Sequence, residues 1–270
     1  MVVEQFSETA ELTEHELTLP RVKRRLLLVP AAYALMRVGR ILLGKRRLLR
    51  LSLNLSWLMR RFAHELSGEA FGVPYYTASM GLSEELLAQW IPSGGSVLDI
   101  GCGTGRWCRI AARHAARVVG IDYSAASIEA ARRMATPAHV EYRIGDLTKD
   151  LRDERFDVAL LIHVLEHIED ADGLLQTIAR RAKTVIVEVP DFESDGLNVV
   201  RHQLGCPWYA DEDHVREYSD AILASQLERN RWSLQTILKR RGMLVAVAVA
   251  AVPQEPAVPL AAARGGARGG

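Results

Sequence analysis

From Val97 onward, short apolar runs alternate with longer stretches in which apolar residues recur at helical spacing. The pattern predicts five strands, at residues 97–100, 118–121, 140–144, 157–162 and 185–189, with helical stretches between most of them. Strands joined through helices lie parallel in one sheet that is covered on both faces. We therefore expect a doubly wound, Rossmann-like α/β domain.

The last part of this domain has a different pattern. Residues 219–229 predict a helix, and residues 233–239 and 243–251 predict two strands joined tightly through Arg241 and Gly242. Such a hairpin would complete a seven-stranded sheet with an antiparallel edge. An insertion at residues 190–218 precedes it, at the edge of the sheet where substrates often bind.

The N-terminal region is basic and rich in leucine. From residue 17 to residue 64 the chain has twelve Lys or Arg residues and no Asp or Glu. The pattern predicts two helices, broken near Pro30 and near Gly44, and then a loop or short helix at residues 65–80. We interpret residues 17–80 as a basic helical extension. It forms a lid whose leucines pack on the core, or contacts an anionic membrane through residues 21–61, or does both.

The remaining composition bounds the organisation of the chain. Residues 1–16 carry no apolar period and residues 253–270 are rich in Pro, Ala and Gly, so we expect a flexible tail and a disordered tail around a domain at residues 81–252. No apolar run reaches the roughly 18 to 20 residues of a membrane span. The three cysteines form no CxxC pair, which favours reduced thiols. We expect a cytoplasmic protein, with peripheral contact at the inner membrane surface as an open possibility.

The strongest local signal is the run from Val97 to Gly105, in which an apolar strand ends in the sequence Gly-Cys-Gly-Thr-Gly. Glycines there let the backbone approach a ligand closely. Arg106 follows where a dinucleotide fingerprint would continue, which disfavours a nicotinamide cofactor. Asp99 could orient the loop or meet a cationic ligand, and Asp122, after the second strand, could accept two ribose hydroxyls. Together these residues predict a nucleoside site.

This segment resembles the first motif of the class I S-adenosylmethionine-dependent methyltransferases, and the resemblance runs roughly from residue 81 to residue 251. It implies S-adenosyl-L-methionine as cofactor, with Gly101 and Gly103 against its methionine part, Asp122 on its ribose, Tyr123 beside adenine and Asp146 accepting from the adenine amine. The expected cofactor-binding residues are Asp99, Gly101, Cys102, Gly103, Gly105, Asp122, Tyr123, Asp146, Leu147 and His163. Taken singly, the glycines also suit a plain turn, and Asp122 suits a helix N-cap.

The sequence from His163 to His167 after the fourth strand has two interpretations. It matches the HxxEH pattern of a class of zinc peptidases, which needs a helix already running at His163. The methyltransferase resemblance predicts the same sequence after the fourth strand without a metal. In that interpretation His163 lies next to the cofactor, His167 is either a general base or a structural histidine, and Glu166 is structural.

The insertion at residues 190–218 contains a segment, residues 207–219, that resembles part of bacterial methyltransferases acting on sugars and other secondary metabolites. His214 is a second candidate catalytic residue, and Arg216 could meet the acceptor or tie the insertion to the core. The amino-methylating DNA enzymes carry an Asn-Pro-Pro-Tyr or Asp-Pro-Pro-Tyr sequence after the fourth strand, and this chain does not resemble them there. We therefore expect no specific nucleic acid as a partner. The expected acceptor is a small-molecule hydroxyl, on a sugar, a quinone-like phenol or a secondary metabolite. A non-catalytic binder of the cofactor and a zinc hydrolase are the alternatives.

Overall fold

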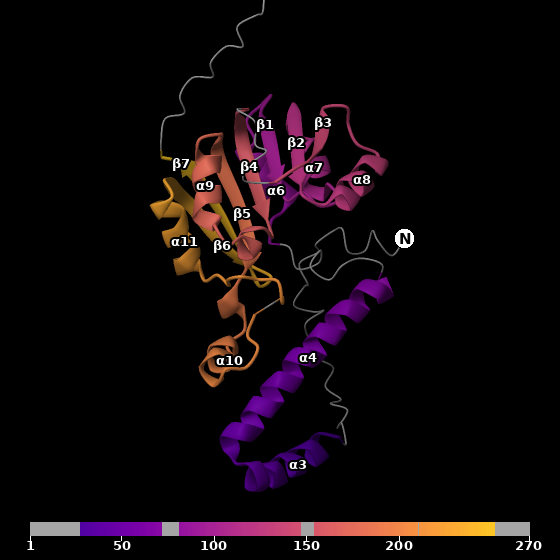
Figure 1. Cartoon of the computed structure of the whole chain (residues 1–270), viewed down its shortest axis with the longest axis vertical. Helices are drawn as coiled ribbons and strands as arrows, with labels where there is room; N and C mark the ends of the chain where they lie inside the picture. Colours follow the sequence, from indigo (N-terminus) through magenta and orange to yellow (C-terminus); the bar gives the residue numbers. More distant parts are fainter. Residues whose placement is uncertain (1–27, 72–80, 147–153, 210, 252–270) are drawn as a thin grey trace, which may run out of the picture. The chain divides into compact units, whose positions relative to one another are not determined.

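The computed structural model describes residues 28–71, 81–146, 154–209 and 211–251 (Figure 1). The expected tails at residues 1–16 and 253–270 lie outside the described residues, and so does the part of the expected loop at residues 65–80 that follows residue 71. The chain forms two compact units. The helical unit takes in residues up to 81 together with 190–219 and 239–243, and the α/β unit takes in residues 82–189, 220–238 and 244 onward. The expected insertion thus falls in the helical unit.

A seven-stranded sheet, in the order β3-β2-β1-β4-β5-β7-β6, is the main feature of the α/β unit. β1 pairs in parallel with β2 and β4, β2 with β3, and β4 with β5. The strands are β1 (Ser96–Ile100), β2 (Arg117–Asp122), β3 (Val140–Ile144), β4 (Phe156–Ile162), β5 (Ala182–Pro190), β6 (Trp232–Arg240) and β7 (Met243–Ala250). The expected doubly wound sheet with an antiparallel edge hairpin is confirmed.

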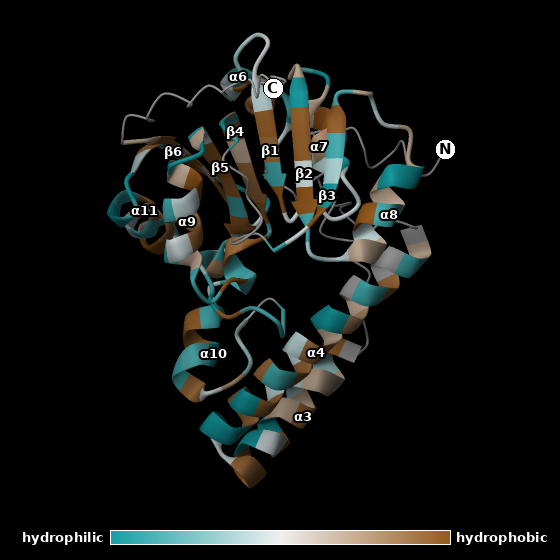
Figure 2. Cartoon of the chain, turned by 45° about the horizontal axis from the view of Figure 1, so that its top comes forward, coloured by the Kyte–Doolittle hydropathy of each residue, from teal (hydrophilic) through white to brown (hydrophobic). Residues whose placement is uncertain are grey.

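Consecutive residues along the central strands are buried, which shows that both faces of the sheet are covered by helices. Figure 2 shows these strands as mainly hydrophobic. α7 (Arg106–Ala111) packs on β1 and β2, and α8 (Ala125–Arg133) packs on β2 and β3. The other helices of this unit are α6 (Glu84–Trp90), α9 (Ala171–Ala179), α11 (Asp220–Arg229) and the 3-10 turn η1 (Leu165–His167). Ser83 caps α6 by accepting from the Leu86 amide.

The β6–β7 connection has the geometry that its sequence predicts. Arg241 has φ of 54° and Gly242 has φ of 81°, so both residues of the turn are left-handed. Two successive left-handed residues match the twist of a tight hairpin. The amide of Ala251 donates to the carbonyl of Arg231 at 2.8 Å and closes the open end of the pair.

In the helical unit, α3 (Leu28–Leu43) and α4 (Lys45–Phe71) differ from the prediction at one place. α3 begins two residues before Pro30, near the expected break, and Pro30 lies in its first turn, where a helix needs no amide donor. The break at Gly44 is confirmed, with φ of 76°. The loop or short helix expected from residue 65 is instead the last part of α4, which continues to Phe71. The insertion forms the 3-10 turn η2 (Phe192–Ser194) and α10 (Asn198–Leu204), and α10 packs on α4.

Gly120, in the middle of β2, has no room for a side chain. A Cβ atom there would lie 2.6 Å from Cys108 Sγ, 2.9 Å from Cys102 Sγ and 3.0 Å from Tyr142 Cδ1. We expect Gly120→Ala to lower the free energy of unfolding by about 1–3 kcal/mol, since overpacking forces the sheet and α7 apart. Urea unfolding followed by circular dichroism measures the change.

Gly196→Ala is the matched control, because a Cβ atom at Gly196 meets nothing within 4 Å. Its stability should stay within about 0.5 kcal/mol of wild type. Equal stability of both variants would show that the space around Gly120 relaxes freely.

Candidate cofactor site

The glycine loop follows β1 at the carboxyl edge of the sheet. Gly101, Gly103 and Gly105 have φ of 67°, 51° and 74°, a region that residues with a Cβ atom rarely adopt. A Cβ atom at Gly101 would lie 2.7 Å from Val164 Cγ2, and one at Gly105 would lie 2.3 Å from the Tyr142 hydroxyl. A Cβ atom at Gly103 would meet nothing within 4 Å. The loop is therefore packed on its inner side and open beside Gly103.

Asp122 ends β2 and holds this loop. Its Oδ2 accepts from the Gly103 amide at 2.8 Å, and its Oδ1 accepts from the Ser124 amide at 2.8 Å. The N-cap of α8 is Ser124, which accepts from the Ser127 amide, so Asp122 itself does not cap that helix. A carboxylate has about four acceptor positions. Asp122, 7% exposed, keeps acceptor capacity beyond these two bonds.

Asp99 lies inside the unit beneath the loop. Cys108 of α7 donates from Sγ to Asp99 Oδ2 at 3.1 Å. Burial raises the pKa of Asp99 to about 7, the Cys108 bond opposes that rise, and the charge of Asp122 adds to it. This contact joins Asp99 to α7, the helix that follows the glycine loop, and both expected roles of Asp99 stay predictions.

The remaining expected residues surround the end of β2 and β3. Tyr123 is 80% exposed, so its ring is open to a ligand, whereas Cys102 is buried at 8%. Asp146 is half-buried and follows Gly145, whose amide donates to the Asp122 carbonyl at 3.0 Å. This bond brings the ends of β2 and β3 together. Leu147 lies outside the described residues.

His163 begins the turn after β4 in a left-handed conformation, with φ of 56°. Its Nδ1 lies 3.2 Å from Glu166 Oε1, and its Nε2 lies 3.2 Å from Glu188 Oε1. Both glutamates are fully buried, and Glu188 Oε2 also accepts from the Leu82 amide at 2.5 Å. Burial of the ring alone would lower its pKa, but the two carboxylates outweigh burial and raise the pKa of His163 to about 9. The ring is therefore an imidazolium at neutral pH.

His167 ends the 3-10 turn η1 and is half-buried, with its amide donating to the Val164 carbonyl at 3.0 Å. The HxxEH interpretation needs a helix that is already running at His163. His163 is left-handed, and only the three residues Leu165–His167 form a 3-10 turn. The helix of the zinc peptidase motif is absent from this described segment.

His214 and Arg216 belong to the helical unit, whereas His163 and His167 belong to the α/β unit. The side chain of His214 is 6% exposed, and its Nδ1 lies 2.9 Å from Glu217 Oε1. Burial next to a carboxylate fixes the orientation of this ring.

The fold and the glycine loop together indicate the class of protein, and a comparison with known protein families gives the same class. The methyltransferase domain family matches residues 77–236, more than half of the chain. The chain belongs to this family and carries its methyltransferase domain, with the fold of the class I S-adenosylmethionine-dependent methyltransferases. This domain agrees with the cofactor that the glycine loop predicts, S-adenosyl-L-methionine.

Several proteins of similar sequence carry the name ubiquinone biosynthesis O-methyltransferase. The chain is 31% identical over 160 residues to the ubiquinone biosynthesis O-methyltransferase of Rhodopseudomonas palustris (strain BisB5), covering 57% of this chain and 62% of that protein. It is 31% identical over 184 residues to the enzyme of the same name from Nitrobacter winogradskyi, covering 58% of this chain and 70% of that protein. The chain spans about three fifths of the length of the first of these relatives.

A solved structure supports the fold. The magnesium protoporphyrin IX methyltransferase from Synechocystis PCC 6803, solved with bound SAH, matches with a TM-score of 0.52 and 20% identity. The match covers 66% of this chain and 88% of that one. At this identity the likeness concerns the fold alone.

Sequence reasoning missed the two glutamates that hold His163. Glu166 was expected to be structural without a named partner, and Glu188 had no expected role. The spacing of three residues between His163 and Glu166 was an available signal for a local pair. The Glu188 contact carries no such signal, because it joins β4 and β5 across 25 residues.

The glutamates around His163 predict a pH dependence. A raised pKa in the folded protein adds stability that is complete below the ordinary pKa of 6.5 and is lost as pH rises through about 9. We expect Glu188→Gln to lower the pKa of His163 toward its ordinary value and to move this loss to lower pH. Titration of the ring nitrogens by NMR, with urea unfolding across the same pH range, measures both changes.

Glu129→Gln, at an exposed position of α8, is the control and should leave the His163 titration unchanged. A midpoint for His163 that is the same in Glu188→Gln and in wild type would contradict the arrangement described above.

Proposed function

We propose that this enzyme transfers the methyl group of S-adenosyl-L-methionine to a hydroxyl of a small-molecule acceptor. The observation that carries the methyl-donor part is the glycine loop, with its open side at Gly103 and the carboxylate of Asp122 behind it. The names of the quinone-biosynthesis relatives support oxygen as the acceptor atom. A quinone-like phenol is accordingly our first choice of acceptor, ahead of a sugar or another secondary metabolite.

The residues at the loop fit the cofactor. Space beside Gly103 admits a ligand against the backbone, and the spare acceptor positions of Asp122 suit ribose hydroxyls. The exposed ring of Tyr123 offers a surface for stacking, and Asp146 offers an acceptor for an exocyclic amine. The bound cofactor supplies a methyl group on a sulfonium, which needs alignment more than activation.

The acceptor hydroxyl must lose its proton as its oxygen attacks the methyl carbon. We assign this proton to His167, because an imidazole takes up a proton near neutral pH. His163 is unsuited to the same role, since its imidazolium is already paired with Glu166 and Glu188. His214 of the helical unit remains a second candidate for contact with the acceptor.

Calorimetric titration of S-adenosylmethionine and S-adenosylhomocysteine tests the cofactor residues. We expect Asp122→Asn to weaken binding of both ligands at least tenfold, because hydrogen bonds to a charged group contribute about 1.5–3 kcal/mol each. Asparagine keeps one acceptor for the loop amides and so limits damage to the fold.

Glu129→Gln again serves as the control and should bind both ligands as wild type does. A lowered melting temperature of Asp122→Asn with unchanged affinity would mean that Asp122 holds the loop without touching the ribose.

Release of S-adenosylhomocysteine in the presence of catechols, hydroquinones and sugars tests the reaction and its base. For an accepted phenol, we expect His167→Gln to lower kcat by about 100-fold or more, with an unchanged Kd for S-adenosylmethionine, since general base catalysis is worth about 10²- to 10⁴-fold. His114→Gln, which alters an exposed pair with Glu84, is the matched control and should keep full activity.

A His167→Gln variant with reduced stability and full kcat would make this histidine structural. Tight cofactor binding without turnover on any acceptor class would favour the non-catalytic binder over the enzyme.

A further inference from the structure

α4 carries a continuous apolar stripe that is exposed to solvent. Its members recur at intervals of three and four residues, which places them on one face of a helix. They are Leu51, Leu55, Leu58, Met59, Phe62 and Leu66, and between 39% and 61% of each is exposed. Single exposed apolar residues are ordinary, but a row of six along one helix indicates a surface that meets another apolar phase.

The opposite face of α4 is already occupied. Leu53 is 3% exposed, the Trp57 indole donates to the Tyr209 carbonyl at 3.1 Å, and Arg61 pairs with Asp211 at 3.2 Å. These contacts fix α4 to the segment that follows β5. The apolar stripe therefore cannot turn inward without breaking them.

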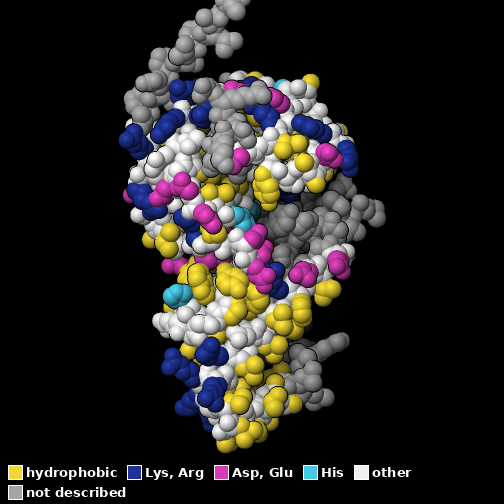
Figure 3. All heavy atoms as spheres, viewed as in Figure 1, with side chains coloured by type: hydrophobic (Ala, Val, Ile, Leu, Met, Phe, Trp, Pro, Cys, Tyr) yellow, Lys and Arg dark blue, Asp and Glu magenta, His cyan; other side chains and the backbone are white. Residues whose placement is uncertain are grey.

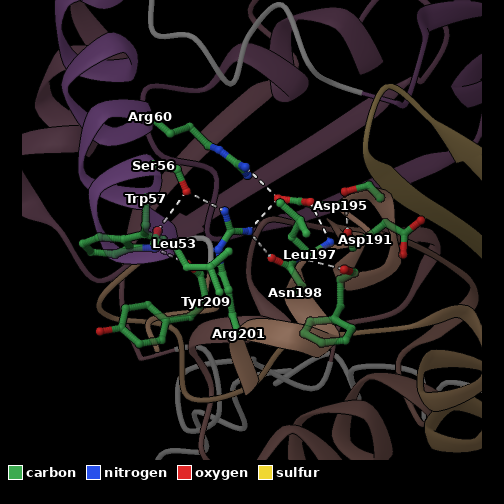
Figure 4. Close-up of polar contacts among 12 residues, drawn as sticks. Leu53, Ser56, Trp57, Arg60, Asp191, Asp195, Leu197, Asn198, Arg201 and Tyr209 are labelled. Carbon is green, nitrogen blue, oxygen red and sulfur yellow. Dashed lines mark hydrogen bonds and ion pairs between the residues drawn. The ribbon is translucent and has the colours of Figure 1, made fainter. Parts of the chain in front are cut away.

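A buried arginine fixes this orientation further (Figure 4). Arg201 of α10 is 1% exposed and donates to Asp195 at 2.6 Å, to Asn198 at 3.0 Å and to Ser56 of α4 at 3.1 Å. Arg60 of α4 donates to the same Asp195 oxygen at 2.6 Å. Burial would raise the pKa of Asp195, but the two guanidinium groups prevail and hold it below its usual range. The rotation of α4 is thus set by charged hydrogen bonds.

Positive charge accompanies the stripe. Residues 28–64 contain no Asp or Glu, and the exposed basic residues of α3 and the first turns of α4 are Arg37, Arg40, Lys45, Arg46, Arg47 and Arg50. α3 adds exposed apolar side chains, among them Leu35 at 73%, Ile41 at 81% and Leu42 at 76%. Figure 3 shows apolar side chains along these helices and a group of Lys and Arg side chains beside them. We call these exposed residues of α3 and α4 the α3–α4 surface.

Within the described part of the chain, no helix combines the length and the apolar character that crossing a bilayer requires. An amphipathic helix with leucines on one face and arginines nearby suits a position in the plane of a membrane interface. There the apolar side chains enter the acyl boundary, while the arginines reach lipid phosphates.

We propose that the α3–α4 surface binds an anionic lipid bilayer. The charge and the apolar character of the surface favour a bilayer over a second copy of the chain and over a nucleic acid. A second copy of the chain would bring these basic groups together, and only Glu65 and Glu69 near the end of α4 could match them. A nucleic acid would match the charge but would leave the leucine stripe in water, and Tyr33 and Phe62 are the only exposed aromatic residues in the described part of α3 and α4. An anionic bilayer satisfies both the charge and the apolar stripe.

The helix that would contact the membrane also holds the segment from Asp195 to Asp211 through the Arg201 and Arg61 contacts. Membrane binding would therefore act on one packed body that includes the residues after β5. This inference concerns a surface outside the cofactor site and does not depend on the identity of the methyl acceptor.

Sedimentation of the full chain with phosphatidylcholine vesicles, with or without phosphatidylglycerol, tests the proposal. We expect binding only to the vesicles with phosphatidylglycerol, and its loss at about 0.5 M salt, where surface charges are screened. Leu55→Gln combined with Phe62→Gln should reduce binding at least tenfold, in keeping with the apolar area withdrawn from the bilayer.

The matched control combines Met134→Gln with Ile222→Gln. Met134 is 49% exposed and Ile222 is 52% exposed, close to Phe62 at 48% and Leu55 at 55%, and both belong to the α/β unit. This variant should bind vesicles as wild type does. Arg46→Gln combined with Arg47→Gln should weaken binding about fivefold for each charge removed, with an unchanged melting temperature.

Equal vesicle binding by the stripe variant and its control would overturn the proposal, and so would the absence of binding by wild type. A fall in melting temperature for the stripe variant, with vesicle binding intact in the arginine variant, would show that the stripe packs on the protein itself. Concentration-dependent dimers, measured by light scattering and abolished by the stripe variant without any vesicle binding, would assign the surface to a second copy.

Discussion

The parallel pairing of β1 between β2 and β4 is the constraint on which the cofactor site depends. It brings the carboxyl ends of three strands to one edge, where the chain must leave the sheet at Ile100, Asp122 and Ile162. The exit from β1 has no room for a side chain, since a Cβ atom at Gly101 would meet Val164 after β4. The exit from β2 supplies the carboxylate that accepts from the Gly103 amide. The glycine loop and the carboxylate of Asp122 are therefore packed together at the same edge of the sheet.

Buried charge at the same edge is held by pairing. His163 carries its charge between two carboxylates that are fully withdrawn from water, and Glu188 also accepts from the Leu82 amide. An unpaired carboxylate there would be costly, so the three side chains and the left-handed turn at His163 stabilise one another. The arrangement joins the ends of β4 and β5 to the residue that precedes the α6 cap. It also leaves His167, and not His163, as the proposed base.

The helical unit follows a different principle. One face of α4 makes polar and aromatic contacts with the segment after β5, and the other face exposes leucines to solvent. Arg201 fixes which face of α4 is exposed. It donates to Ser56 of α4 as well as to Asp195 and Asn198, and these hydrogen bonds can form together in only one rotation of α4 about its axis. A helix with so much exposed leucine and so little acidic charge is suited to an anionic, apolar phase.

The sequence by itself determined the features that depend on local pattern. Short apolar runs located all seven strands, and glycine-containing breaks located the end of α3 at Gly44 and the Arg241-Gly242 turn. The Gly-Cys-Gly-Thr-Gly run led to the methyltransferase family. The local pattern failed in residues 65–71, where α4 continues as a helix through Gly68 instead of giving way to a loop or a separate short helix. Only the tertiary structure decided the contact of His163 with Glu188, the contact of Asp99 with Cys108 and the direction of the leucine stripe. Each of these depends on side chains from different elements that the fold brings together, and such contacts leave no periodic trace in a sequence.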